Sequence, residues 1–129
     1  MRNKIAKGFI IVGALLLAVT AFLHLYLGIP PIAAAIESGH IQRAPSMRPS
    51  ELLGVWVAFS VIFFFIIAAV LAHMRKPSID KFLPLATGLA AIGAALTMLV
   101  YNPGVHIAVP LLSVPGVLII AGAVIFKAE

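Results

Sequence analysis

A long apolar stretch follows Lys7 and constrains the fold more than any other feature. From Gly8 to Gly28 it contains no charged residue, and about 20 apolar residues suffice to cross a bilayer as a helix. A signal peptide is the alternative, since Val19-Thr-Ala21 resembles a cleavage site. The apolar character continues past that motif for a full spanning length. We therefore expect a first transmembrane helix over about 5–28, ended by the Pro30-Pro31 pair.

The remaining chain repeats this pattern. Of its 129 residues, 63% are hydrophobic and 10% are charged, whereas a soluble domain is roughly half apolar and a quarter charged. Three more apolar segments, about 50–73, 80–101 and 105–126, are long enough to span. The sequence therefore predicts an all-α membrane protein, a four-helix transmembrane bundle that forms a single domain over 1–129. Little chain remains for a soluble catalytic domain.

The connections carry their own signals. Residues 31–39 begin with proline and end at Gly39, which predicts a short interfacial helix between the first two spans. Ser78 is the expected N-cap of the third helix. Pro110 and Pro115 fall inside the fourth helix and predict a kink there.

The distribution of positive charge predicts the orientation. A net charge of +5 would also suit nucleic acid, but the basic residues flank the apolar segments, as in membrane proteins. We expect no nucleic-acid partner. Alternating helices place both termini and the 74–81 turn on one side, which we assign to the cytoplasm of a bacterial inner membrane. That side carries Arg2, Lys4, Lys7, Arg75, Lys76, Lys81 and Lys127, and the other side carries Arg43 and Arg48.

Small residues predict the packing faces, because helices in lipid associate through close contact. On the first helix Ala6, Gly13, Thr20 and His24 share one face at 100° per residue. Gly54 and Ala58 offer a small face on the second helix. The third helix offers Ala86, Ala90, Gly93 and Ala94, and we expect it to be the most enclosed.

His24 is the clearest candidate for function, because ionisable groups inside spanning segments are rare. The topology places several polar residues toward the outer end, where they could form one pocket: His24, His40, Glu51, Tyr101, Asn102 and His106. His24, His40, Glu51 and His106 would suit zinc or copper. His24, His106 and Tyr101 would suit haem or a quinone. The alternative is a structural hydrogen bond from His24.

Several absences narrow the function. The chain has no cysteine, which excludes disulfides, thiolate metal sites and iron–sulfur clusters. No Asp, Glu, Lys or Arg lies in the middle of a predicted span, although proton-coupled transport usually requires one. Small multidrug transporters also have four helices, but they depend on a glutamate in the first. The sequence shows no phosphate-binding loop and no hydrolase triad.

The leading hypothesis is a non-enzymatic accessory or structural subunit. It would lie in the lipid bilayer and pack against a larger membrane complex or a second copy of itself. The alternatives are a small redox or ligand-binding membrane protein that uses the outer histidines and, less favoured, a transporter. In helix number and a glycine-containing first helix the chain resembles small bacterial membrane proteins of the DoxX-like kind, some of which accompany quinone-linked enzymes.

Overall fold

Helices make up the described chain. The computed structural model describes residues 2–39, 49–76, 80–101 and 107–126, and contains no strand within them. Its four helices are α1 (Arg2–Glu37), α2 (Pro49–His73), α3 (Phe82–Tyr101) and α4 (Ala108–Ile125). The all-helical prediction is confirmed.

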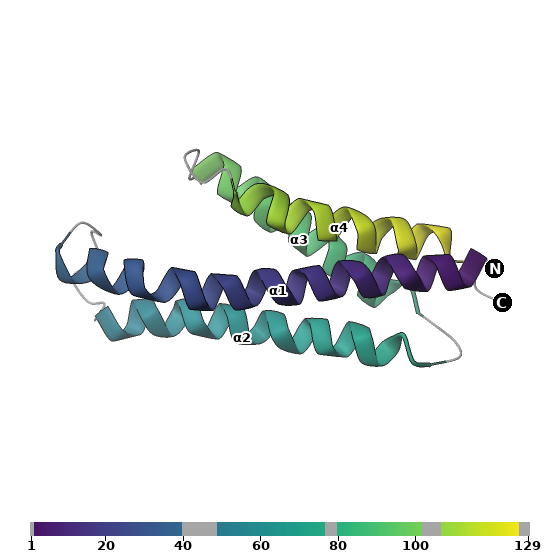
Figure 1. The fold of residues 1–129 in the computed structure, drawn as a ribbon, viewed down its shortest axis with the longest axis horizontal. Coiled ribbons are helices and arrows are strands. Elements are labelled where there is room, and N and C mark those ends of the chain that lie inside the picture. Colours follow the sequence, from purple (N-terminus) through teal and green to yellow (C-terminus); the bar gives the residue numbers. More distant parts are fainter. Residues whose placement is uncertain (1, 40–48, 77–79, 102–106, 127–129) are drawn as a thin grey trace.

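Two helical hairpins pack side by side, with α1 and α4 in the middle (Figure 1). The most extensive contacts join α1 to α4 and α3 to α4, while α2 packs on α1 and barely touches α3. The expectation that α3 is the most enclosed helix is therefore wrong. The helix with the two largest interfaces is α4, because it lies between α1 and α3.

The first helix is longer than its prolines predicted. α1 continues through Pro30 and Pro31 to Glu37, so the predicted end at Gly28 and the separate interfacial helix are both wrong. Each proline removes one backbone hydrogen bond, but the alanine-rich segment that follows has a high helix propensity. The predicted stop at Gly39 is confirmed, since its φ is +73°.

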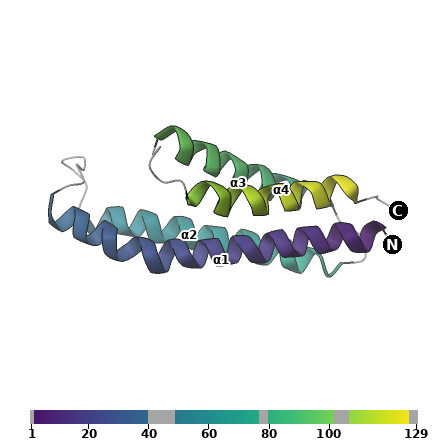
Figure 2. The same cartoon turned by 45° about the horizontal axis from the view of Figure 1, so that its top comes forward.

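The two hairpins differ in length. At 1.5 Å per residue the 36 residues of α1 extend about 54 Å, and the 20 and 18 residues of α3 and α4 extend about 30 and 27 Å. In Figure 2 the loop end of the α1–α2 hairpin projects past the α3–α4 hairpin. We call this projecting part, residues 25–37 and 49–59, the α1–α2 arm.

Glycines bring α1 and α4 into close contact. A Cβ atom built on Gly13 would lie 2.6 Å from Ile119 Cγ1 and 2.8 Å from the Pro115 carbonyl oxygen. One built on Gly122 would lie 2.6 Å from the Ala6 carbonyl oxygen. The predicted face of α1 is confirmed here, because Ala6 and Gly13 are both buried.

A second pair of glycines joins α3 to α4. A Cβ atom on Gly88 would lie 2.9 Å from the Gly116 carbonyl oxygen. The buried residues of α3 are Pro84, Thr87, Gly88, Ala91 and Ala95. The buried face of α3 differs from the predicted packing face, because Ala90 and Gly93 are exposed. Every third or fourth residue of α3 is small, so residue size alone did not identify the packed face.

The helix α2 packs through its larger residues. Among the side chains of α2 that the structure describes, the buried ones are Ser60, Ile67 and Val70, followed by Met74 directly after the helix. The predicted small face is wrong for packing within this chain, because Gly54 and Ala58 are exposed and no heavy atom lies within 4 Å of a Cβ built on Gly54.

Three helices are long and apolar enough to cross a membrane: α1, the Phe82–Val100 part of α3, and α4. The described apolar part of α2, Val57–His73, is shorter. The chain is thus consistent with a membrane protein built as a helical bundle.

Local features explain where α3 begins and why Pro110 is tolerated in α4. The Asp80 carboxylate accepts the Phe82 N–H at 2.9 Å and caps the start of α3. The predicted cap, Ser78, lies outside the described residues. Pro110 lies in the first turn of α4, where its missing N–H breaks no helical bond. Only Pro115 interrupts the backbone hydrogen bonds within α4.

Candidate functional site

A histidine–serine pair joins α1 to α2. The distance from His24 Nδ1 to Ser60 Oγ is 2.8 Å, and the centroids of the His24 and Phe59 rings are 6.3 Å apart. Ser60 is 1% exposed. His24 therefore points into the protein, as its shared face with Ala6, Gly13 and Thr20 predicted.

The pair lies where the α1–α2 arm begins. Thr20 contacts Leu111 in the first turns of α4, and His24 is four residues further along α1, about 6 Å. His24 is therefore close to the level at which α4 begins. Because α1 continues to Glu37, His24 lies well inside this helix and not near its end.

The other predicted site residues have separate outcomes. His40, Asn102 and His106 lie outside the described residues, as does the side chain of Tyr101, whose backbone ends α3. Glu51 lies in the first turn of α2, nine residues before Ser60 and so about 13 Å from it along the helix axis. Among the described residues, no three histidine or acidic side chains are grouped closely enough to hold a metal ion.

A second polar contact crosses the α1–α4 interface. The Thr20 hydroxyl lies 2.8 Å from the Leu111 carbonyl oxygen and 2.9 Å from the Leu16 carbonyl oxygen of its own helix. In a regular helix the Leu111 carbonyl would accept from residue 115, but that residue is proline and has no N–H. Thr20 thus supplies a donor that α4 lacks.

The opposite end of the molecule carries a third group of polar contacts. The Lys7 ammonium donates to the carbonyl oxygens of Met74 and Lys76, at 3.3 and 3.2 Å. These carbonyls follow the end of α2, where a positive charge is favoured. His73 Nε2 accepts the Asp80 N–H at 2.9 Å, which links the end of α2 to the start of α3.

One feature of the sequence indicates Ser60 as the partner of His24. Ser60 is the single polar residue of the apolar run 57–72. In lipid a lone hydroxyl needs a partner, and α1 carries a lone imidazole. Pairing the two indicates the contact. The predicted outer pocket drew the partners of His24 from His40, Glu51, Tyr101, Asn102 and His106, and the observed partner Ser60 was not among them.

The described geometry joins one imidazole, one hydroxyl and one aromatic ring between α1 and α2. His24 and Ser60 form one interhelical pair, and an imidazole beside an aromatic ring can hold a ligand or stabilise a helix pair. No protein-family model, curated protein or solved structure matches this chain.

Proposed function

We propose that this protein is an integral-membrane accessory subunit that packs laterally against a larger membrane complex. One observation carries the proposal, a row of residues along the exposed side of α2, which elsewhere exposes the large side chains of Phe59 and Ile62. The residues of this row recur at helical spacing and are mostly small: Gly54, Ala58, Val61, Phe65, Ala68 and Ala72, all of them exposed. We call this set the outer face of α2.

From Phe9 to Leu27 the exposed side of α1 contains no small residue, and this contrast supports a partner at α2. The exposed side of α1 carries large apolar side chains typical of lipid contact: Ile5, Val12, Leu15, Val19 and Phe22. Small residues let another helix approach closely, which is the main source of helix association in lipid. The outer face of α2 therefore suits a helix of a partner better than it suits lipid.

The lengths of the two hairpins support one position for the bilayer. A hydrocarbon core of about 30 Å fits the lengths of α3 and α4, and in the proposed position the α1–α2 arm lies beyond the hydrocarbon. Pro30 and Pro31 leave the carbonyls of Tyr26 and Leu27 without helical donors, and water at the interface can satisfy them. The stacked rings of Phe22 and Tyr26, 5.9 Å apart, then form an aromatic anchor at this boundary.

In this placement α1, α3 and α4 span the hydrocarbon core, the 60–73 part of α2 lies beside α1 within it, and the basic end lies in the cytoplasm of a bacterial cell. The arm extends outward from the opposite surface. A partner helix would contact Val61, Phe65, Ala68 and Ala72 within the bilayer, and Gly54 and Ala58 in the arm would add contacts outside it.

Two matched substitutions test the proposal. Ala68→Leu places a bulky group on the outer face of α2, and Val12→Leu changes the exposed side of α1 by one methylene. After purification in a mild detergent, the unmodified protein and Val12→Leu should elute in a stable assembly with a second polypeptide, and Ala68→Leu should elute without it.

The mass of the assembly decides the partner. A multiple of 13.6 kDa alone would show a homo-oligomer in place of a larger complex. A free monomer of the unmodified protein, with native lipid retained, would contradict the proposal.

A small redox or ligand-binding protein is the second candidate, favoured by the half-buried His24 beside Phe59. His24→Gln keeps hydrogen-bonding capacity toward Ser60 but removes the imidazole. If His24 binds haem, a metal or a quinone, the purified protein should carry that group in stoichiometric amount. The variant should then lose it while remaining folded, as measured by absorption spectra and metal analysis. Equal spectra without any bound group in both proteins would rule this candidate out.

A further inference from the structure

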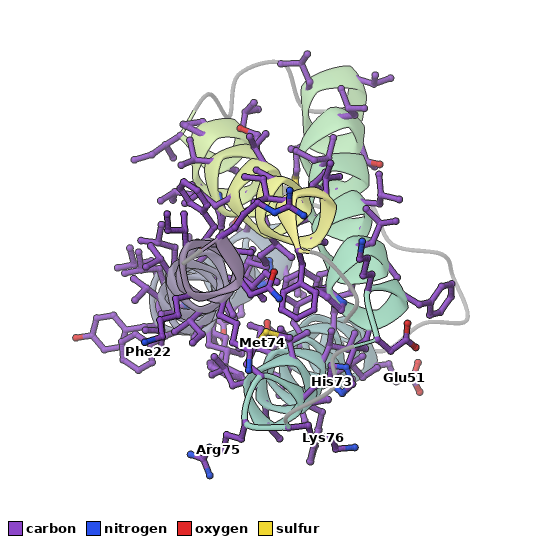
Figure 3. The ribbon with its side chains drawn as sticks, turned by 90° about the vertical axis from the view of Figure 1, so that its right-hand side faces the viewer. Phe22, Glu51, His73, Met74, Arg75 and Lys76 are labelled. Carbon is purple, nitrogen blue, oxygen red and sulfur yellow. The ribbon has the colours of Figure 1, made fainter. Side chains whose placement is uncertain are left out.

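Positive side chains from three helices meet at one end of the molecule. The beginning of α1, the end of α2 and the beginning of α3 lie together there, and Figure 3 views this end directly. The basic residues are Arg2, Lys4, Lys7, Arg75, Lys76 and Lys81. Within the described residues, Asp80 is the one acidic side chain at this end, and its carboxylate caps α3.

The contacts divide these cations into two groups. Lys7 is held by the carbonyls of Met74 and Lys76, so its charge is used to fasten α1 to α2. The side chains of Arg2, Lys4, Arg75 and Lys76 are exposed, and in Figure 3 Arg75 and Lys76 extend outward from the end of α2 while Met74 lies toward the other helices. We call these four exposed residues the basic rim.

In the bilayer position proposed above, on which this inference rests, the basic rim lies at the depth of lipid headgroups. Lys7 fixes the end of α2 beside the first two turns of α1, so the cations of both helices lie at the same end of the molecule. The apolar residues Ile5 and Phe9, directly beyond them along α1, are exposed and would contact acyl chains. Along α1 the charged residues are thus followed by exposed apolar residues, just as the charged headgroup of a phospholipid is followed by its acyl chains.

We propose that the basic rim binds the phosphate headgroups of anionic phospholipids in the adjacent leaflet. A juxtamembrane Lys or Arg contributes about 1 kcal/mol to such binding. Two neutralised cations therefore lower the preference for anionic over zwitterionic lipid roughly 30-fold. Lys7 has a positioning role, because it holds the α2 cations next to those of α1.

The test is a lipid competition with the full-length protein. The protein is reconstituted in nanodiscs that contain equal amounts of phosphatidylglycerol and phosphatidylcholine, then released into mild detergent, and the retained lipids are counted by native mass spectrometry. The unmodified protein should retain mostly phosphatidylglycerol. Arg75→Gln/Lys76→Gln should lose most of this preference, while Arg75→Lys/Lys76→Arg should keep it.

A matched control comes from the connection between α1 and α2. Arg43→Gln/Arg48→Gln removes the same charge from a segment predicted to lie on the other side of the membrane and should leave the preference unchanged. An equal loss in this control, or equal retention of both lipids by the unmodified protein, would overturn the proposal. So would inorganic phosphate that displaces the retained lipid at millimolar concentration, which would indicate a site for a free anion.

Folding is monitored separately so that a failed variant is recognised. Circular dichroism of Arg75→Gln/Lys76→Gln should match the unmodified protein, because neither side chain is buried. If that variant unfolds, Arg2→Gln/Lys4→Gln removes two rim charges from α1 and should lower the preference similarly. Retention of the preference by a folded variant of either pair would contradict the proposal.

Discussion

Single polar side chains are disproportionately important in a chain as apolar as this one. Thr20 is the clearest case, because its hydroxyl supplies a hydrogen bond that Pro115 removes from α4. The hydroxyl has one proton, so the Leu16 and Leu111 carbonyls share it. Prolines are tolerated in membrane helices where a neighbouring side chain satisfies the released carbonyl. Thr20 and Pro115 should therefore be energetically coupled.

Replacing Thr20 tests this coupling. Thr20→Val should lower the free energy of unfolding in detergent by about 1 kcal/mol, and Thr20→Ser should cost less because it keeps the hydroxyl. In a Pro115→Ala background the Leu111 carbonyl regains its helical donor. There Thr20→Val should cost clearly less than it does alone. Strictly additive costs in this double-mutant cycle would show that Thr20 acts only within α1.

At the scale of the helices, the close approach of neighbouring backbones determines how the helices pack, more than the volume of their side chains does. Gly13, Gly88 and Gly122 each leave room for a carbonyl oxygen or an isoleucine side chain of the facing helix. A backbone oxygen cannot move aside without shifting its helix. These positions should therefore be the most sensitive to added volume.

Two glycine substitutions separate packed from open positions. Gly13→Ala should destabilise the protein by about 1–3 kcal/mol through overpacking. Gly93→Ala should be neutral or stabilising by up to about 1 kcal/mol, because nothing lies within 4 Å of a new Cβ atom and alanine favours the helix. Chemical unfolding in micelles measures both. Equal costs would show that α3 packs through Gly93 after all.

The long helix α1 also makes the membrane boundary testable. Leu15 and Leu27 are both exposed, by 51% and 60%, but the proposed bilayer covers only Leu15. In the cysteine-free background, Leu27→Cys should react rapidly with a membrane-impermeant maleimide and Leu15→Cys slowly. Similar reactivity in liposomes would mean that the α1–α2 arm is embedded in lipid.

At the scale of the whole molecule, two hairpins of unequal length give the protein two different ends. One end is closed by Lys7, His73 and the buried Phe126, and carries the basic rim. The other end carries the projecting arm. Because basic segments remain in the cytoplasm, this asymmetry predicts a single orientation in the membrane.

Two single cysteines test the orientation. In intact cells, Ser38→Cys should react with an impermeant reagent and Ser78→Cys should react only after permeabilisation. Reaction of both from the outside, or the reverse pattern, would contradict the predicted orientation.

The sequence by itself determined the helical class, the apolar segments and the ends that have local causes. Gly39 ends α1 because glycine adopts positive φ readily, and charge separates the two ends of the molecule. The shared face of Ala6, Gly13 and Thr20 was also predictable, because helical periodicity is a local property.

Only the tertiary structure decided which helices meet and at what depth. Small residues occur all around α3, so the choice of Gly88 over Gly93 depends on the position of α4. Pro30 and Pro31 end a helix only when nothing compensates for the lost bonds, and the helical segment that follows continues α1. The partner of His24 likewise depends on how far α2 is shifted along α1. The Lys7 contacts hold the end of α2 beside the beginning of α1, and in this register Ser60 lies opposite the imidazole.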